Sequence, residues 1–298
     1  MDGDGLLKTI DTLAIVGLGL MGASLGLAAR QRGIARRVVG SARRSETRAE
    51  ALRRGVVDVA CEQPGEAVRE AELVVFCLPV LTIFDAIAAC GKDFRRGSVV
   101  TDVGSTKTDL ARTIGPLLAG TGVQFVGSHP IAGSEQTGLE AARADLYEGA
   151  VVVVTPPDGR MAPGFEAVRE LWAAVGGVVE TMTPEAHDRV LARTSHLPHL
   201  AAAALVRAVL GQSGEDVAGF CGSGFRDTTR VAGGSEDLWH DIVKTNGNAI
   251  GAELAAYSGE LERLRDLVAR GDFEGVRAFL AQARDWRKNM RAGKERGA

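Results

Sequence analysis

Short apolar runs alternate with stretches of helical periodicity over the first part of the chain. Residues 13–16 and 73–78 are almost continuously apolar, which is typical of strands whose two faces are both covered, and residues 98–103 form another strand-like segment. Between them, helical stretches end at glycines. Strands that alternate with helices indicate βαβ units and a mostly parallel sheet. Further strands are expected at 37–40, 125–127 and 150–154, and helices at 21–32 and 46–54.

The pattern changes after about Thr183, where no further strand signal is found. An alanine- and leucine-rich helical stretch over 184–211 is interrupted by Pro198, and a second, over 235–268, is followed by a last helix at 273–290. One face of the second stretch is apolar, because its large side chains recur every three or four residues: Leu254, Tyr257, Leu261, Leu264 and Val268. We therefore predict an α/β domain over residues 1–182 and an all-α domain over residues 183–298.

Composition excludes several classes of function. The 298 residues are 45% hydrophobic and 24% charged with a net charge of -3, so two globular domains are expected and nucleic-acid binding is not. Four cysteines form no CxxC pair, which favours a reduced, cytoplasmic protein without a zinc site. The acidic N-terminus predicts no signal peptide, and no apolar run of about 18 residues predicts a membrane span.

A glycine motif follows the first strand and begins the first helix. The segment Gly17-Leu18-Gly19-Leu20-Met21-Gly22 fits GxGxxG in the position that dinucleotide binding requires. The glycines allow a tight turn, a close approach of the pyrophosphate and helix–strand packing, and the helix N-terminus favours the phosphates. We therefore predict a Rossmann-type cofactor site that uses these glycines with Leu20 and Met21, and with Leu78 and Pro79 at the end of a neighbouring strand.

The end of the second strand distinguishes between two cofactors. An NAD site usually has an acid there, about 20 residues after the motif, but this chain has Ser41, followed after one residue by Arg43 and Arg44. Two guanidinium groups and a hydroxyl suit a 2′-phosphate. The sequence favours NADP, and NAD remains the alternative if the two arginines are only solvated.

Two polar segments follow strand ends, where ligands bind in α/β proteins. His129 lies between Ser128 and Pro130, and because Pro130 excludes helix before it, we expect His129 on a stiff loop just past a strand, six residues before Glu135. Ser105 follows another strand and either hydrogen-bonds His129, touches the nicotinamide, or only caps the next helix.

The helical half carries two more polar groups. The segment Ser195-His196-Leu197-Pro198-His199 places a proline between two histidines, and a glycine-rich loop leads to Asp227 and Arg230. Those two residues are three apart, so they share a face if the segment is helical. We interpret His187 and His240 as ordinary helix or surface histidines, and Trp239 as a packing residue.

These motifs together resemble the prephenate/arogenate dehydrogenase family of tyrosine biosynthesis. The pieces that match are the glycine motif, Asp102-Val103-Gly104-Ser105, Gly127-Ser128-His129-Pro130 with Gly133 and Glu135, Ser195-His196-Leu197-Pro198-His199 and Gly224-Phe225-Arg226-Asp227 with Arg230. The resemblance implies a Rossmann-type domain followed by a helical domain that forms a homodimer. It implies oxidative decarboxylation of a cyclohexadiene that carries a ring carboxylate and a hydroxyl, with hydride transfer to the nicotinamide and no metal.

The same resemblance assigns roles to the candidate residues. His129 would accept the hydroxyl proton, and Ser105 would orient the His129 ring. Arg230 would bind a substrate carboxylate. His199 would line the pocket near Asp227, Glu135 would act at its mouth, and His196 would be a core residue. Prephenate and arogenate stay open, although Asp227 could favour the ammonium group of arogenate.

Two other functions compete with this one. A β-hydroxyacid dehydrogenase would share the architecture but use a lysine as acid and base, for which Lys244 with Asn248 is the candidate. A dinucleotide-sensing module without turnover would need no catalytic side chains, and the set of His129, Ser105, His199 and Arg230 disfavours it.

Overall fold

The computed structural model describes residues 9–132, 136–156, 163–211 and 217–292. It divides into two compact units, 1–247 and 248–298. All four cysteines are free. Within the ranges described, no helix is long and apolar enough to cross a membrane.

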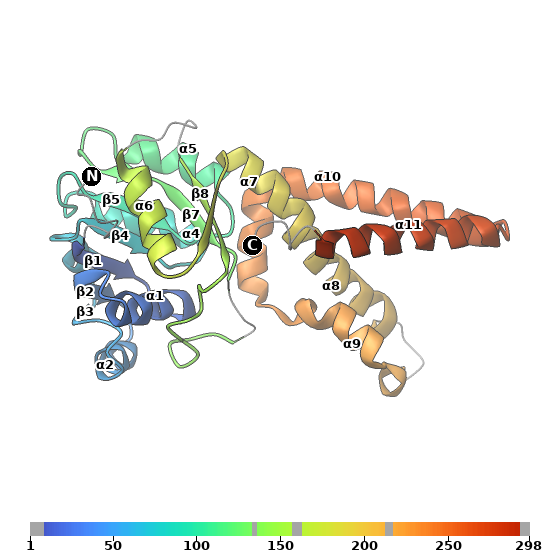
Figure 1. Cartoon of the computed structure of the whole chain (residues 1–298), viewed down its shortest axis with the longest axis horizontal. Helices are drawn as coiled ribbons and strands as arrows, with labels where there is room; N and C mark the ends of the chain where they lie inside the picture. The colour runs from blue at the N-terminus through green and yellow to red at the C-terminus, as the bar shows by residue number, and fades with distance from the viewer. Residues whose placement is uncertain (1–8, 133–135, 157–162, 212–216, 293–298) are drawn as a thin grey trace. The chain divides into compact units, whose positions relative to one another are not determined.

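A six-stranded parallel sheet forms the centre of the first unit, in the order β3-β2-β1-β4-β5-β6 (Figure 1). The predicted α/β architecture is confirmed. Neighbouring strands align so that Val16 is level with Ser41 and Phe76, and Phe76 with Asp102. The carboxyl ends of four strands therefore lie along one edge. The strands are β1 (Ile10–Val16), β2 (Ala35–Ser41), β3 (Val59–Cys61), β4 (Leu73–Phe76), β5 (Val99–Asp102) and β6 (Gln124–Phe125).

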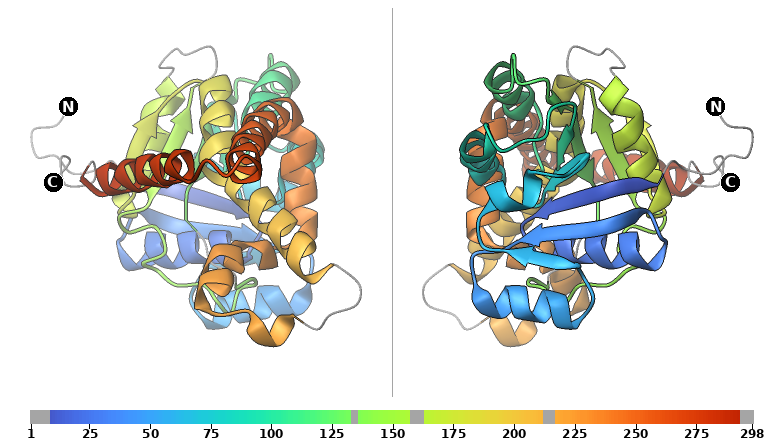
Figure 2. Two further views of the ribbon diagram at one scale, coloured as in Figure 1. Left: turned by 90° about the vertical axis from the view of Figure 1, so that its right-hand side faces the viewer. Right: turned by 90° about the vertical axis from the view of Figure 1, so that its left-hand side faces the viewer.

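Helices cover both faces of this sheet (Figure 2). Successive β1 side chains are buried on opposite sides, Leu13 and Ile15 in one core cluster and Ala14 and Val16 in the other, as the period of two in a strand requires. The first cluster includes α1 (Leu20–Gln31), α2 (Ser45–Arg53) and α6 (Pro163–Ala174). The second includes α3 (Pro64–Val68), α4 (Val80–Cys90) and α5 (Thr108–Leu117).

A second, three-stranded sheet was not expected. It consists of β7 (Gly127–Pro130), β8 (Val151–Thr155) and β9 (Val178–Thr181), with β7 antiparallel to β8. The predicted loop position of His129 is therefore wrong, because His129 lies inside β7 opposite Val153. Pro130 does exclude helix, but the extended geometry it favours also suits a strand, and a proline is tolerated at the end of an edge strand.

Residues described after β9 are all helical or irregular, which confirms the helical second half. The predicted interruption near Pro198 is a π-helix at Ala192–His196, which joins α7 (Pro184–Leu191) to α8 (Leu197–Leu210) and puts Pro198 in the first turn of α8. The long helix α10 (Glu236–Ala269) is kinked at Asn246. Shorter elements precede it, namely 3₁₀ turns at Ala218–Phe220 and Arg230–Gly233 and α9 (Ser223–Thr229).

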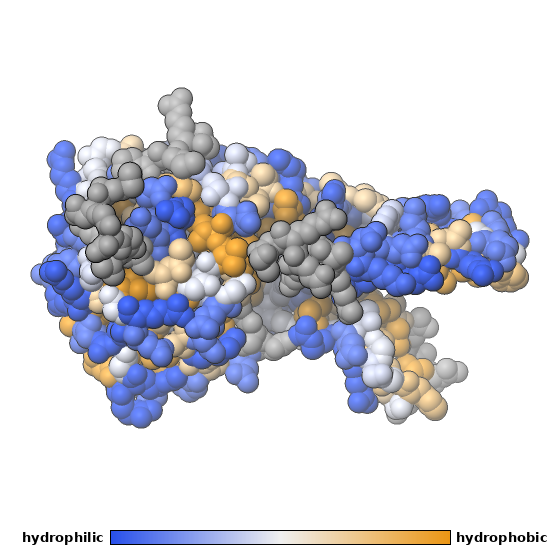
Figure 3. Space-filling view, viewed as in Figure 1, coloured by the Kyte–Doolittle hydropathy of each residue, from blue (hydrophilic) through white to orange (hydrophobic). Residues whose placement is uncertain are grey.

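The second unit consists of the C-terminal part of α10, a turn at Gly271, and α11 (Phe273–Ala292). The Arg263 guanidinium lies 5.8 Å from the centre of the Phe279 ring. In Figure 3 the visible side of these helices is mostly hydrophilic with scattered apolar patches. The boundary between the two compact units lies within α10, after residue 247. The last strand, β9, ends much earlier, at Thr181. The predicted domain boundary at residue 182 therefore stays a prediction. The large apolar side chains exposed in this unit are Leu254, Tyr257, Leu261, Val268, Phe273, Leu280, Trp286 and Met290.

Candidate active site

Each of the three motif glycines occupies a position that favours glycine for a different structural reason. Gly17 has a φ of +99°, and a Cβ there would lie 2.4 Å from the Cys77 carbonyl oxygen. A Cβ at Gly22 would lie 1.9 Å from the Gly17 carbonyl oxygen, so only glycine lets α1 approach the turn this closely. A Cβ at Gly19 would meet nothing within 4 Å. The open side of the turn is therefore at Gly19, where a phosphate would approach.

The residues around this turn fit a dinucleotide. Gly19 precedes α1, no side chain caps that helix, and its first turn, which contains Leu20 and Met21, has no acidic residue. Its unsatisfied N–H groups and positive dipole end therefore favour an anion. A cavity of about 1020 Å³ adjoins the turn. Seven of the predicted cofactor residues line it: Gly17, Gly19, Ser41, Arg43, Arg44, Leu78 and Pro79.

Charges of both signs line the far part of this cavity. Ser41 is buried at the end of β2, and the exposed Arg43 and Arg44 follow it. Glu62, just after β3, also lines the cavity, and Arg48 Nη2 lies 3.1 Å from its carboxylate. The spacing from the glycine motif did not indicate Glu62, because Glu62 follows β3, which lies beside β2 in the sheet.

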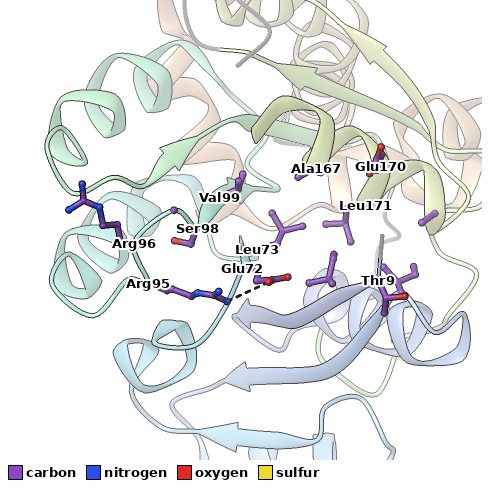
Figure 4. Close-up of a pocket in the computed structure, with 14 residues that line it drawn as sticks. Thr9, Glu72, Leu73, Arg95, Arg96, Ser98, Val99, Ala167, Glu170 and Leu171 are labelled. Carbon is purple, nitrogen blue, oxygen red and sulfur yellow. Dashed lines mark hydrogen bonds and ion pairs between the residues drawn. The ribbon is translucent and has the colours of Figure 1, made fainter. Parts of the chain in front are cut away.

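A smaller cavity of about 310 Å³ lies at the opposite edge, at the amino ends of β1, β4 and β5 (Figure 4). Arg95 reaches Glu72 at 3.5 Å, and Ser98 Oγ is buried without a hydrogen-bond partner among the residues described. Ligands of open α/β sheets bind at the carboxyl ends of the strands. We therefore place the active site at the glycine turn and not here.

His129 is half-buried and contacts a second histidine. Its Nδ1 lies 2.9 Å from His187 Nε2, and the two rings meet edge-on with centres 5.1 Å apart. The Nδ1 atom of His187 lies 2.8 Å from Asp188 Oδ1. The interpretation of His187 as an ordinary histidine is therefore wrong. It is completely buried, and 58 residues separate it from its partner in sequence, so no local pattern could have joined them.

The same carboxylate caps helix α5. Asp188 Oδ1 accepts a hydrogen bond from the Lys107 N–H at 2.8 Å, and Oδ2 accepts one from the Thr108 N–H at 2.9 Å. No side chain of the local turn caps this helix, so the idea that Ser105 is its cap is wrong. Ser105 lies half-buried in the turn between β5 and α5, and the hydrogen bond found at His129 is to His187 instead.

A buried ion pair joins that turn to the sheet. Lys107 Nζ contacts Asp102 Oδ2, and both side chains are almost completely buried. Asp102 also accepts hydrogen bonds from the Gly104 N–H at 2.8 Å and the Ser128 N–H at 3.2 Å. The Ser128 hydroxyl in turn donates to the Asp102 carbonyl at 2.6 Å. The ends of β5 and β7 are thereby held together next to His129, an arrangement that the sequence reading missed.

Burial keeps the histidines neutral. The pKa of His129 is lowered well below its ordinary value by burial first, then by His187 and by the Lys107 ammonium. Burial also lowers the pKa of His187, although Asp188 opposes the shift. A histidine with a lowered pKa keeps its lone pair as the pH falls below 6.5, so His129 is available as a base at neutral pH.

On the helical side, aromatic contacts hold the histidines of the proline segment. His199 is buried and stacks on Trp239, with ring centres 3.5 Å apart and planes 12° apart. His196 meets the edge of Trp239 and lies 3.3 Å from Asn246 Nδ2, which also donates to the Asp188 carbonyl at 2.8 Å. The predictions that His196 is a core residue and that Trp239 packs are confirmed.

Three of the remaining candidate residues, Asp227, Arg230 and Lys244, are exposed. Asp227 is exposed on α9 and Arg230 is exposed three residues later. The described ring contact of His199 is with Trp239, and its proposed position near Asp227 stays a prediction. Glu135 lies outside the described residues. Lys244, the acid and base of the β-hydroxyacid alternative, is exposed on α10.

Two family models match the chain. One is described as prephenate dehydrogenase, nucleotide-binding domain, and matches residues 25–181; the other is prephenate dehydrogenase, dimerization domain, and matches residues 183–282.

Individual relatives agree with these matches. The cyclohexadienyl dehydrogenase of Zymomonas mobilis is 33% identical over 263 residues, which cover 87% of this chain and 89% of the relative. The crystal structure of prephenate dehydrogenase from A. aeolicus, in complex with hydroxyphenyl propionate and NAD+, has a TM-score of 0.89 at 30% identity and covers 96% of this chain and 100% of its own. Synechocystis arogenate dehydrogenase has a TM-score of 0.80 at 30% identity, with 94% and 99% covered.

Proposed function

Because this chain belongs to the prephenate dehydrogenase family, we propose that it catalyses the oxidative decarboxylation of prephenate or arogenate in tyrosine biosynthesis. When bound at the glycine turn, a nicotinamide dinucleotide would supply the hydride acceptor. The observation that carries the proposal is His129, a half-buried histidine with a lowered pKa in β7, which is tied to the carboxyl end of β5. That end lies at the same edge of the sheet as the glycine turn.

The reaction needs a base and a place for its proton. His129 takes the hydroxyl proton as the ring carbon that carries the hydroxyl is oxidised to a carbonyl, with its hydride leaving for the nicotinamide that would be bound there. Loss of the ring carboxylate as CO₂ then leaves its electron pair in the ring, which becomes aromatic. The same proton returns to the phenolic oxygen, so His129 ends the cycle neutral. General acid–base catalysis of this kind accelerates reactions by about 10²–10⁴-fold.

Other side chains would bind the substrate. Arg230 is suited to a carboxylate, because a guanidinium forms paired hydrogen bonds to it. The position of Ser105 in the turn after β5 supports a role for its hydroxyl in binding the substrate hydroxyl. His199, Asp227 and Glu135 complete the proposed set, with Asp227 as the group that would attract the ammonium of arogenate.

A matrix of prephenate and arogenate with NAD and NADP tests the function. We expect reduced cofactor and CO₂ to form in equal amounts with at least one substrate. Turnover of a β-hydroxyacid without either of these reactions would restore that alternative, although the exposed Lys244 disfavours it. Binding of the dinucleotide without any turnover would instead indicate a sensing module.

For the cofactor we propose NADP, with NAD as the alternative. The absence of an acid at Ser41 and the two arginines that line the cavity support NADP, whereas Glu62 in the same cavity and the NAD+ complex of the A. aeolicus relative support NAD. The double variant Arg43→Ala/Arg44→Ala should raise KM for NADP at least about 10-fold, since charge-assisted hydrogen bonds contribute about 1.5–3 kcal/mol each. KM for NAD should stay within about two-fold. An equal change for both cofactors would count against a 2′-phosphate site.

We also propose a homodimer formed through the helical domain. The dimerization model supports it, and so do the exposed apolar side chains of α10. Leu254, Tyr257, Leu261 and Val268 recur at helical spacing on one face, and contiguous exposed apolar patches mark interaction sites. Leu261→Asp should convert dimers into monomers in size-exclusion chromatography with light scattering, since a carboxylate in an apolar interface would be desolvated. Glu262→Gln, at the neighbouring exposed position, should leave the dimer intact. A Leu261→Asp protein that elutes as the wild type would contradict this interface.

A further inference from the structure

Three ionisable side chains form a hydrogen-bonded chain that ends at the proposed base. His187 Nδ1 lies 2.8 Å from Asp188 Oδ1, and His187 Nε2 lies 2.9 Å from His129 Nδ1. His187 and Asp188 are both buried. An ionised carboxylate can only accept hydrogen bonds, so it places the ring hydrogen of His187 on Nδ1. His187 Nε2 is then an acceptor, and His129 must donate to it from Nδ1.

We propose that Asp188 and His187 are positioning residues for the reaction. They hold His129 in the tautomer whose Nε2 carries the lone pair, and it is this atom that receives the hydroxyl proton of the substrate. The inference rests on the proposed function. Once protonated, His129 donates from Nδ1 to His187, whose own N–H points at the Asp188 carboxylate. Asp188 and His187 therefore stabilise the imidazolium that forms on His129 during turnover, as the carboxylate of a Ser-His-Asp triad stabilises its histidine.

The surroundings make such an acceptor necessary. Besides His187, the charged and titratable groups among the described residues that act on His129 are Lys107 before α5 and His196 on the π-helix, and both lower its pKa. Asp102 is paired with Lys107. Asp188 is thus the described carboxylate that hydrogen-bonds the histidine pair, whereas Asp102 acts on His187 through its charge alone. Burial raises the pKa of Asp188, but hydrogen bonds from His187 and Thr108 outweigh it and lower the pKa overall, so Asp188 is ionised at neutral pH.

The hydrogen-bonded series of Asp188, His187 and His129 is also anchored to neighbouring helices. Asp188 binds two N–H groups at the start of α5, and its carbonyl accepts a hydrogen bond from Asn246 at the kink of α10. Helix α7 is therefore held from two sides, and the His187 ring is completely buried where it meets His129. A carboxylate that only capped α5 would not need a histidine between itself and His129.

Two substitutions at one position separate positioning from packing. His187→Asn retains an amide at the place of Nδ1, where it reaches Asp188, but has no atom at Nε2. His187→Gln places an amide oxygen near Nε2, where it can accept from His129. We expect kcat of the Asn variant to fall about 10- to 100-fold, within the range of acid–base catalysis, with KM for the cofactor unchanged. The Gln variant should recover to within a few-fold of wild type.

The pH profile gives a second readout. The acid limb of kcat/KM reports protonation of His129, and wild-type activity should persist below pH 6.5 because its pKa is lowered. The repulsion by which His187 lowers the pKa of His129 acts only when both rings are protonated. Since burial keeps His187 neutral, its removal takes away an acceptor rather than a charge. The imidazolium is then less stable, so the acid limb of His187→Asn should move to lower pH. An unchanged kcat and acid limb in His187→Asn, or equal losses in both variants together with lower melting temperatures, would overturn the proposal.

A measurement without turnover distinguishes this inference from the proposed function. Nitrogen-15 NMR of the ring nitrogens reports which atom of His129 carries the hydrogen. We expect Nδ1–H in the wild type and a loss of that preference in His187→Asn. Inactivity of the wild type towards prephenate and arogenate would refute the function alone, whereas an Nε2–H tautomer in the wild type would refute the positioning role alone.

Discussion

Replacing His129 by asparagine should lower kcat with prephenate or arogenate by about 10³-fold, within the range for removal of a general base. Asparagine keeps an amide at the place of Nδ1, so the contact with His187 survives, but no atom remains at Nε2 to take the proton. Because His129 lies in β7 and not among the residues that line the cofactor cavity, the dissociation constant of the nicotinamide cofactor should not change. Stopped-flow formation of reduced cofactor and fluorescence titration measure the two quantities.

A matched histidine gives the control. His240 is exposed and contacts its neighbour Asp241, so His240→Asn should leave kcat within two-fold. If His129→Asn kept more than a tenth of wild-type turnover, another group would have to act as the base and the proposed mechanism would be wrong.

Replacing Asp102 by alanine should destabilise the protein by about 3–5 kcal/mol, the usual cost of leaving one partner of a buried ion pair alone. Lys107 would remain buried as a cation, and the N–H groups of Gly104 and Ser128 would lose their acceptor. Burial already lowers the pKa of Lys107, and Asp102 opposes that shift. Without Asp102 the pKa should fall further, so part of the loss would be relieved at high pH, where the amine is neutral.

Urea unfolding measures this change in the free energy of unfolding. The control is Asp145→Ala, which removes a carboxylate from an exposed ion pair with Arg143 and should cost no more than about 1 kcal/mol. Equal losses for the two variants would mean that the buried pair does not hold the ends of β5 and β7 together.

The cofactor half of the site was predictable because its signals are local. Three features of the site favour glycine within six residues. Gly17 forms the tight turn, Gly22 allows the close approach of helix and strand, and Gly19 leaves one face of the turn open. The alternation of apolar strands and helices likewise depends on neighbours only a few residues apart. These features predicted the parallel sheet, and the motifs around His129 and His199 supported the family resemblance.

The second sheet escaped prediction because its evidence is not local. The segment 127–130 is extended whether it forms a loop or a strand, and only pairing with β8, some 20 residues later, makes it a strand. Glu62 escaped for the same reason, since it reaches the cofactor cavity through strand order and not through its distance from the glycine motif.

By itself, the sequence determined the alternation of elements, the dinucleotide turn and the identity of the candidate base, because each depends on short-range sterics or on a single side chain. Only the tertiary structure decided what surrounds that base. Its partner His187, the carboxylate of Asp188 and the buried pair of Asp102 and Lys107 come from segments that meet only when β5, β7 and α7 pack. A hydrogen bond depends on distance in space, so contacts 58 residues apart leave no periodic trace in the chain.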